Sequence, residues 1–217
     1  MASLTNSSLS LEEKIHNLAR KSSEALLKQI NFRLEEMKVD DTSHFLIYRV
    51  LGITEKEGRL IDIYQNKGRF LYKYAGSFLE KATQLSFLEK YPDSKSVKIT
   101  NTLGSRPKTF EIDCLEGNNA IEIKWRDATT DGDHITKEHT RIKAISTAGY
   151  KPIRIMFYYP NRQQAIRIQQ TLETLYKGIG GEYYYGESAW NYVTERTGID
   201  LKAILQRIAD QNTASDE

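Results

Sequence analysis

Apolar residues recur at helical spacing through the N-terminal part of the chain. Over residues 9–37 they stand three or four positions apart, as in an amphipathic helix, and Ser10 with Glu13 matches a capping box at its start. Further helical patterns cover residues 41–51, 54–65 and 68–90, the last ending before Tyr91-Pro92. The N-terminal third is therefore predicted to be helical.

After Pro92 the spacing changes to short runs in which apolar and polar residues alternate, as in strands with one buried face. These runs cover residues 97–101, 109–115 and 120–126. A helix over residues 134–148, capped by Asp133, a buried strand over 152–159 and a helix over 161–176 are expected to follow. Residues 178–186 are expected to form a loop, and two helices near 188–196 and 200–209 end the chain.

This order predicts an α/β protein with a mixed central sheet flanked by helices. We expect residues 1–92 to form a helical region packed on the core, residues 93–177 to form the α/β core, and residues 178–217 to form a C-terminal loop and helices. All three parts are expected to belong to one structural domain, since 217 residues can bury one large core.

The composition narrows the class of protein more than its function. The single cysteine, Cys114, excludes an internal disulfide and a multi-cysteine zinc site, and no apolar run is long enough to cross a bilayer. A cytoplasmic prokaryotic protein without membrane attachment or a small-molecule cofactor is expected. The net charge of +2 is too small to indicate nucleic acid binding by itself, so any DNA-binding role must be argued from a site.

Charged residues alternate with apolar ones on the two strands that flank Gly117-Asn118-Asn119. A hairpin turning on Gly117-Asn118 places Asp113 directly opposite Glu122, whereas one turning on Asn118-Asn119 places Asp113 opposite Lys124. Either two-residue turn is expected to leave Asp113, Glu122 and Lys124 on one polar face of the sheet, opposite an apolar face.

Two converging carboxylates repel each other unless a cation lies between them, and hard oxygen ligands suit Mg²⁺. With a lysine beside it, such a site favours phosphodiester hydrolysis. A surface hairpin with cross-strand ion pairs would show the same residues, and Glu-x-Lys alone is a weak signal. The order helix, strand, Asp-bearing strand, Glu-x-Lys strand, helix and buried strand is more specific.

The arrangement Ile112-Asp113 followed by Glu122-Ile123-Lys124 resembles the PD-(D/E)XK nuclease superfamily over residues 76–159. The resemblance implies that Asp113 and Glu122 hold Mg²⁺ with the carbonyl of Ile123, that Lys124 is the motif lysine, and that hydrolysis of DNA leaves a 5′-phosphate. The chain departs from the pattern at Ile112, where the motif often has proline, and in its short spacer between Asp113 and Glu122.

Two longer stretches, residues 64–78 and 151–160, resemble the ApaLI-like type II restriction endonucleases. They contain Tyr64-Gln65-Asn66-Lys67-Gly68-Arg69-Phe70 with Tyr74-Ala75-Gly76-Ser77-Phe78, and Lys151-Pro152-Ile153-Arg154 with Phe157-Tyr158-Tyr159-Pro160. This resemblance implies a homodimer that cuts the palindrome GTGCAC in double-stranded DNA. A repair, recombination or mobile-element nuclease, or a DNA-binding protein without catalysis, is the alternative.

Other polar residues have two readings each. Glu80 on the helix before the sheet could support the metal site or pair with Lys73 or Lys81, and Glu111 could be a further ligand or a partner of Lys124. Four basic residues that follow the motif could contact DNA or could form a solvated helix face: Arg126, Lys137, Arg141 and Lys143.

The remaining polar and aromatic features favour structural roles. Asp127, Asp131 and Asp133 fit turns and helix capping, and His134 and His139 are poorly spaced for sharing a metal. The glycine- and tyrosine-rich residues 178–186 lack the Gly-Lys-Ser/Thr sequence of a phosphate-binding loop. Their tyrosines could enter a DNA groove or a dimer interface, or could cover the core.

Overall fold

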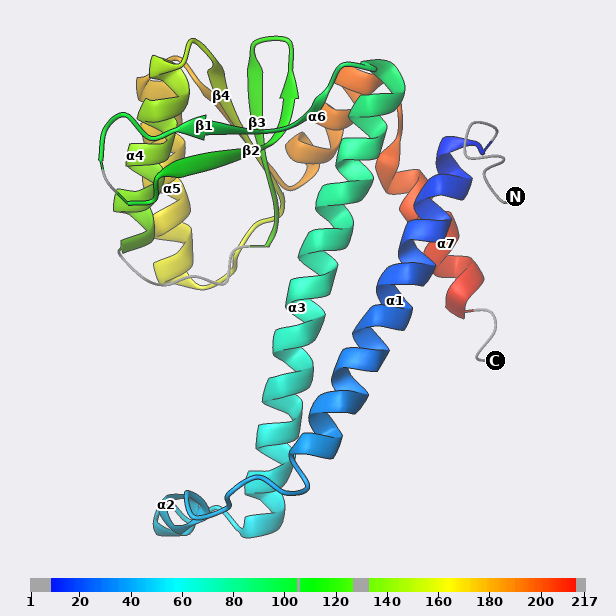
Figure 1. Ribbon diagram of the computed structural model, residues 1–217, viewed down its shortest axis with the longest axis vertical. Helices are drawn as coiled ribbons and strands as arrows, with labels where there is room; N and C mark the ends of the chain where they lie inside the picture. The colour runs from blue at the N-terminus through cyan, green and yellow to red at the C-terminus, as the bar shows by residue number, and fades with distance from the viewer. Residues whose placement is uncertain (1–8, 105, 127–132, 214–217) are drawn as a thin grey trace. The chain divides into compact units, whose positions relative to one another are not determined.

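The protein contains a five-stranded mixed sheet flanked by helices (Figure 1). The structure is a computed structural model that describes residues 9–104, 106–126 and 133–213. The side chains of residues 133, 134 and 213 are not described. The strand order is β1-β2-β3-β4-β5, with antiparallel pairing from β1 to β3 and parallel pairing from β3 to β5. The four predicted strands lie in one sheet, and the α/β class is confirmed. The strands are β1 (Lys95–Thr100), β2 (Thr109–Glu116), β3 (Asn119–Arg126), β4 (Lys151–Tyr158) and β5 (Glu182–Tyr185).

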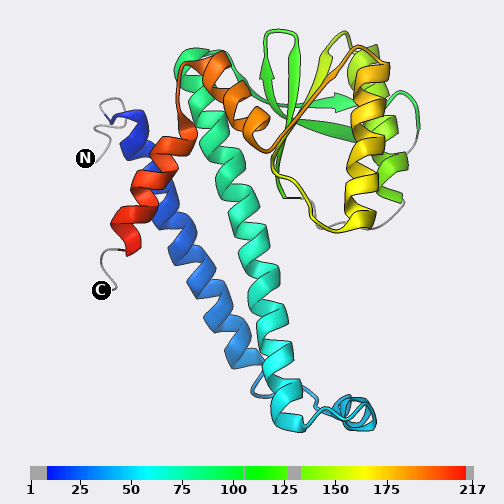
Figure 2. The same cartoon turned by 180° about the vertical axis from the view of Figure 1, so that it is seen from behind.

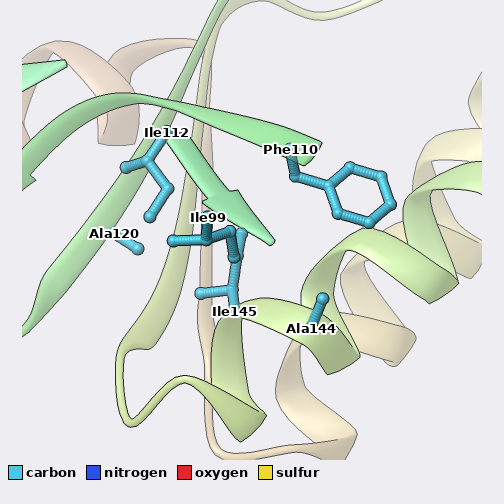
Figure 3. Close-up of a cluster of buried hydrophobic side chains, with 6 residues drawn as sticks. All are labelled: Ile99, Phe110, Ile112, Ala120, Ala144 and Ile145. Carbon is cyan, nitrogen blue, oxygen red and sulfur yellow. The ribbon is translucent and has the colours of Figure 1, made fainter. Parts of the chain in front are cut away.

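Helices cover both faces of the sheet (Figures 1 and 2). The two helices that connect the parallel strands, α4 (Asp133–Thr147) and α5 (Gln163–Gly178), pack on one face. On the opposite face Trp190 of α6 (Glu187–Thr197) packs on Phe157 with ring centroids 4.2 Å apart, and α7 (Leu201–Thr213) follows. A buried apolar cluster joins the sheet to α4 (Figure 3), and its members are Ile99, Phe110, Ile112, Ala120, Ala144 and Ile145.

The described chain divides into two compact units. The sheet unit contains residues 9–15 and the residues from Leu79 onward, and the helical unit is His16–Phe78. The helical unit holds most of α1 (Leu11–Glu36), all of α2 (Phe45–Val50) and the first part of α3 (Glu55–Lys90). None of the helices that the structure describes is long and apolar enough to cross a membrane.

Capping boxes fix the starts of the two long helices. Ser10 and Glu13 exchange side-chain and backbone hydrogen bonds at the start of α1, as predicted, and Thr54 and Glu57 do the same at the start of α3. The predicted break before Gly68 is wrong, because α3 is continuous over 36 residues. An isolated glycine costs a helix only about 1 kcal/mol, and no proline interrupts this segment.

Strand β2 carries one more residue than its neighbour β1 beside Asp113. The pairing passes from Val97–Ile112 to Lys95–Leu115, so three steps along β2 match two along β1. As a result Ile112 packs toward α4 with Ala120, whereas Cys114 lies beside Ile121 on the opposite face of the sheet. The predicted division into one apolar and one charged face is therefore wrong: apolar and acidic side chains share the α4 face, where Glu122 is buried.

The predicted loop over residues 178–186 contains a fifth strand, β5. Tyr183 is buried and donates a hydrogen bond of 2.6 Å to Gln169, while the ring of Tyr184 stacks on Tyr192. Gly181 directly precedes this strand. A Cβ added to Gly181 would lie 2.5 Å from the Pro152 carbonyl oxygen, so this close approach requires glycine. These tyrosines cover the core, which was one of the two predicted alternatives.

Candidate active site

The hairpin between β2 and β3 turns on Gly117-Asn118, the first of the two predicted registers. Glu116 pairs with Asn119, and Gly117 has a φ of 55°, which a glycine adopts without strain. The paired residues end at Cys114–Ile121, immediately before the positions of Asp113 and Glu122. The catalytic candidates therefore lie where the two strands begin to separate.

Asp113 lies at the fork, the point where β2 and β3 begin to separate, and both its side chain and its backbone accept hydrogen bonds there. Its Oδ2 accepts a hydrogen bond of 2.8 Å from the backbone N–H of Ile123 on β3. Its carbonyl oxygen accepts a hydrogen bond of 2.7 Å from Nε2 of Gln84 on α3. The Asp113 carboxylate thus takes the place of a backbone carbonyl as the acceptor for the Ile123 N–H. This hydrogen bond holds the carboxylate next to the Glu-x-Lys segment.

Lys124 lies between the two acidic side chains. Its Nζ contacts Oε1 of Glu122 and lies 3.9 Å from Oδ2 of Asp113. The structure therefore brings Asp113, Glu122 and Lys124 together. The Lys124 side chain remains about one-third exposed, so the cluster opens to solvent at its lysine end.

Glu122 is 2% exposed and depends on α4 for its second counter-charge. Nη1 of Arg141 donates a hydrogen bond of 2.6 Å to Oε1 of Glu122, and Nη2 contacts Oε2. The same Nη2 donates to the carbonyl oxygen of Glu111. Arg141, which was a candidate DNA contact, is thus engaged inside the protein, with its guanidinium bound to the acidic cluster and to β2.

A second layer of buried charge lies beneath this pair. Glu138 on α4 accepts hydrogen bonds from Nη1 of Arg154 at 3.1 Å and from the hydroxyl of Tyr176 at 2.7 Å, and lies 4.0 Å from Nη1 of Arg141. Burial would raise the pKa of Glu138, but the charges of Arg154 and Arg141 and the Tyr176 hydroxyl lower it below the ordinary value. A continuous chain of opposite charges therefore runs from Glu122 into the core.

The environment of Asp113 disfavours its ionised form. Burial, and next the charge of Glu122, raise the pKa of Asp113 to about 7, although Lys124 and the N–H of Ile123 act in the opposite direction. The charges of Lys124 and Arg141 lower the pKa of Asp113 but do not fully offset its burial. A further cation at this point would stabilise the ionised form.

Glu80 on α3 belongs to the same electrostatic environment. Burial raises the pKa of Glu80, the Lys124 charge opposes the shift, and the charges of Glu122 and Glu111 add to it. Gln84 lies between the groups, since its Nε2 also approaches Oε1 of Glu80 at 3.4 Å while bound to the Asp113 carbonyl. The carboxylate of Glu111 accepts a hydrogen bond from Ser96 on β1 instead of pairing with Lys124.

Three of the basic DNA-contact candidates, Arg126, Lys137 and Lys143, are exposed. Arg126 ends β3, while Lys137 and Lys143 lie on α4, the helix that also carries Arg141. Asp127 and Asp131 fall outside the described residues, as do the side chains of Asp133 and His134. These three residues thus place positive charge on the surface along β3 and α4.

A family model described as ApaLI-like restriction endonuclease matches residues 4–210. The chain belongs to this family. No curated protein and no solved structure matches the chain. Family membership establishes a nuclease that acts on DNA.

Sequence reasoning missed two residues of this restriction endonuclease, Glu138 and Arg154. The sequence contains one sign of this pair, an arginine within the apolar run of β4, because a charge in a buried strand requires a buried partner. Arg154 is 0% exposed, and the partner comes from α4, one helix earlier in the chain. Only the three-dimensional arrangement identifies Glu138 as that partner.

The oxygens at the fork fit a divalent cation of the magnesium type. Among the described residues there is no group of three or more His, Cys, Asp or Glu side chains that could hold a metal. The endonuclease offers two carboxylates, Asp113 and Glu122, and Mg²⁺ commonly binds through one or two carboxylates while it retains water.

Proposed function

We propose that the protein is a type II restriction endonuclease that hydrolyses duplex DNA at a short palindromic site with Mg²⁺, through a PD-(D/E)XK centre made of Asp113, Glu122 and Lys124. The observation that carries the proposal is the contact of one ammonium group with two buried carboxylates where β2 and β3 separate. Family membership supplies the DNA substrate.

Asp113 and Glu122, with the backbone carbonyl of Ile123, would hold the ion. When bound, Mg²⁺ neutralises charge on the phosphate and lowers the pKa of coordinated water. The chain's own residues prepare these oxygens: the Ile123 N–H orients the Asp113 carboxylate, and Arg141 orients that of Glu122. Two ligands held by separate elements can be placed precisely because neither can rotate freely.

Lys124 is the solvent-accessible cation of the centre, and its ammonium donates hydrogen bonds without accepting any. It orients the attacking water and stabilises charge on the phosphate oxygens. Water attacks phosphorus, the bond from phosphorus to the 3′ oxygen breaks, and the 3′ oxygen takes a proton. The products are a 3′-hydroxyl and a 5′-phosphate.

A palindrome presents two equivalent half-sites, so a two-fold symmetric protein reads both with one surface. We therefore propose a homodimer in which the exposed Arg126, Lys137 and Lys143 contact backbone phosphates. The resemblance to ApaLI-like enzymes extends over residues 64–78 and 151–160 and supports GTGCAC as the target.

Cleavage of a plasmid with a single GTGCAC sequence tests this function. With Mg²⁺ we expect one linear product, and sequencing of its ends should show 5′-phosphates at the palindrome. A smear, structure-selective nicking or cleavage at another sequence would contradict the site specificity. Calcium should support binding but little cleavage, because its looser coordination aligns water less well.

A further inference from the structure

Helix α3 exposes an apolar stripe in the helical unit. Its five members are between 41% and 65% exposed. At 100° per residue they fall within an arc of about 120° on one side of the helix, with Gly68 inside the arc. The stripe consists of Leu60, Ile61, Tyr64, Leu71 and Tyr72.

Other sides of α3 contact the neighbouring helices of this unit. Toward α2, the Tyr48 ring lies against Gly58, and the Tyr48 hydroxyl donates a hydrogen bond of 2.8 Å to Asp62. Toward α1, Ile63 lines a cavity together with Leu34 and Met37. No stripe residue lines this cavity. In this unit α3 thus has an apolar side that contacts α1 and α2, and the stripe is a second, separate apolar face.

The amount of apolar surface fits a protein interface. Side chains of this size present on the order of 150–200 Å² when fully exposed, so five at about half exposure leave on the order of 400 Å². Apolar atoms make up about 56–65% of an interface, and each partner in a standard interface contributes about 800 Å². The stripe with its polar margins approaches the area that a stable dimer needs.

The sequence of α3 favours an antiparallel over a parallel pair of identical helices. Residues 67–73 contain three cations, Lys67, Arg69 and Lys73, and a parallel pair would set them level with the same three cations of the other copy. An antiparallel pair centred on the stripe sets them level with residues 59–65, where the acidic Asp62 accompanies Arg59. Fewer like charges therefore lie at one level in the antiparallel pair.

We propose that this stripe is the surface on which a second copy of the chain docks, with the two α3 helices antiparallel across a two-fold axis. The inference rests on the proposed function, since two copies related by a two-fold axis can each cut one strand of a palindromic duplex. With the axis near Asn66, the Tyr64 ring of each copy lies opposite Gly68 of the other, where the absent side chain leaves room for it.

Two substitutions in the stripe test the proposal without disturbing the unit's interior. Leu71→Glu places a charge in the interface. Gly68→Arg blocks close approach, yet an added Cβ at Gly68 would meet nothing within 4 Å in the chain itself. The matched control is Leu27→Glu on α1, because Leu27 is 57% exposed, similar to Leu71 at 50%, and lies outside the stripe.

Sedimentation equilibrium of the full chain, alone and with plasmid-derived DNA fragments, measures the dimer dissociation constant. We expect wild type and Leu27→Glu to be dimeric, and both stripe variants to dissociate at least tenfold more readily with unchanged helical circular dichroism. Dimers of wild-type affinity in both variants, or a monomeric wild type, would overturn the proposal.

A parallel plasmid assay keeps the two proposals distinguishable. The stripe variants retain the catalytic cluster, so they should nick supercoiled plasmid where wild type linearises it. If no variant and not even wild type cleaves DNA, the proposed function fails, while sedimentation still decides whether the stripe is the docking surface.

Discussion

Nη1 of Arg141 donates a hydrogen bond of 2.6 Å to Oε1 of Glu122, a carboxylate that is 2% exposed. Arg141 therefore positions a proposed metal ligand from a helix outside the hairpin. We expect Arg141→Ala to reduce cleavage by on the order of 10²-fold or more and to weaken Mg²⁺ binding, because Glu122 would lose its fixed orientation. Arg141→Lys should recover part of the activity.

Isothermal titration with Mg²⁺ and single-turnover cleavage measure these effects of Arg141. Lys143→Ala, an exposed cation on the same helix, is the control for general loss of positive charge. Equal losses in Lys143→Ala and Arg141→Ala, with unchanged Mg²⁺ binding, would assign Arg141 to DNA contact instead.

The three residues at the fork should be required for chemistry but not for folding. Asp113→Ala, Glu122→Gln and Lys124→Ala are each expected to lower the cleavage rate by about 10³-fold or more, since each removes an interaction made with the reacting phosphate or its metal. Lys124→Ala should also bind Mg²⁺ more tightly, because its ammonium no longer competes for the carboxylates. Lys90→Ala, an exposed lysine at the end of α3, should cut normally.

Cleavage and DNA binding are measured separately for this set, by gel assay and by fluorescence anisotropy. Binding should survive in all three variants. A near wild-type cleavage rate for Lys124→Ala would show that the fork is an ordinary ion-paired hairpin.

The pKa of Asp113 should make the metal-free protein less stable as the pH rises. The folded-state pKa of about 7 lies above the ordinary value of 3.8, so between these values the folded state holds a proton that the unfolded state has released. Stability from this group is full below about pH 4 and is lost as the pH rises through 7. Asp113→Asn keeps an oxygen for the Ile123 N–H but has no charge to bury.

We therefore expect Asp113→Asn to be more stable than wild type at pH 8 without divalent ions, by on the order of 1–3 kcal/mol. The difference should shrink toward pH 4, and Mg²⁺ should stabilise wild type alone. Urea unfolding at both pH values provides the measurement. A pH-independent difference would mean that Asp113 ionises normally in the fold.

Glu138 should be a structural requirement of the core. Glu138→Gln leaves Arg154, which is fully buried, without its carboxylate partner. Breaking a buried ion pair in this way costs about 3–5 kcal/mol. Thermal unfolding of this variant and of Glu173→Gln, whose partner Lys177 is exposed, gives the comparison. A change below about 1 kcal/mol in Glu138→Gln would show that the buried charge is compensated elsewhere.

The local pattern was sufficient to predict the hairpin and to limit its turn to two registers, because Gly117-Asn118-Asn119 and the flanking alternation are short-range signals. It could not predict that Ile112 and Cys114 lie on different faces, since the extra residue in β2 depends on pairing with β1, which is remote in sequence. Asp113 and Glu122 follow directly after the paired Cys114 and Ile121, so their convergence agrees with one of the two turns that the local pattern predicts.

Long-range pairing also explains the other differences. β5 was missed because its four residues follow glycines, and only the edge of β4 makes them a strand. Arg141 was predicted as a candidate DNA contact because it follows the motif strand closely in the sequence. Its carboxylate partner lies on β3, and no spacing rule relates the two positions.

The burial of Cys114 turns the only thiol of the chain into a built-in reporter. The residue is 1% exposed, and burial, then the charges of Glu116 and Asp113, raise its pKa to about 12, so the folded protein presents almost no reactive thiolate. Alkylation can proceed only through transient opening of β2 beside Asp113. The labelling rate therefore measures how often β2 opens locally beside Asp113, without any engineered probe.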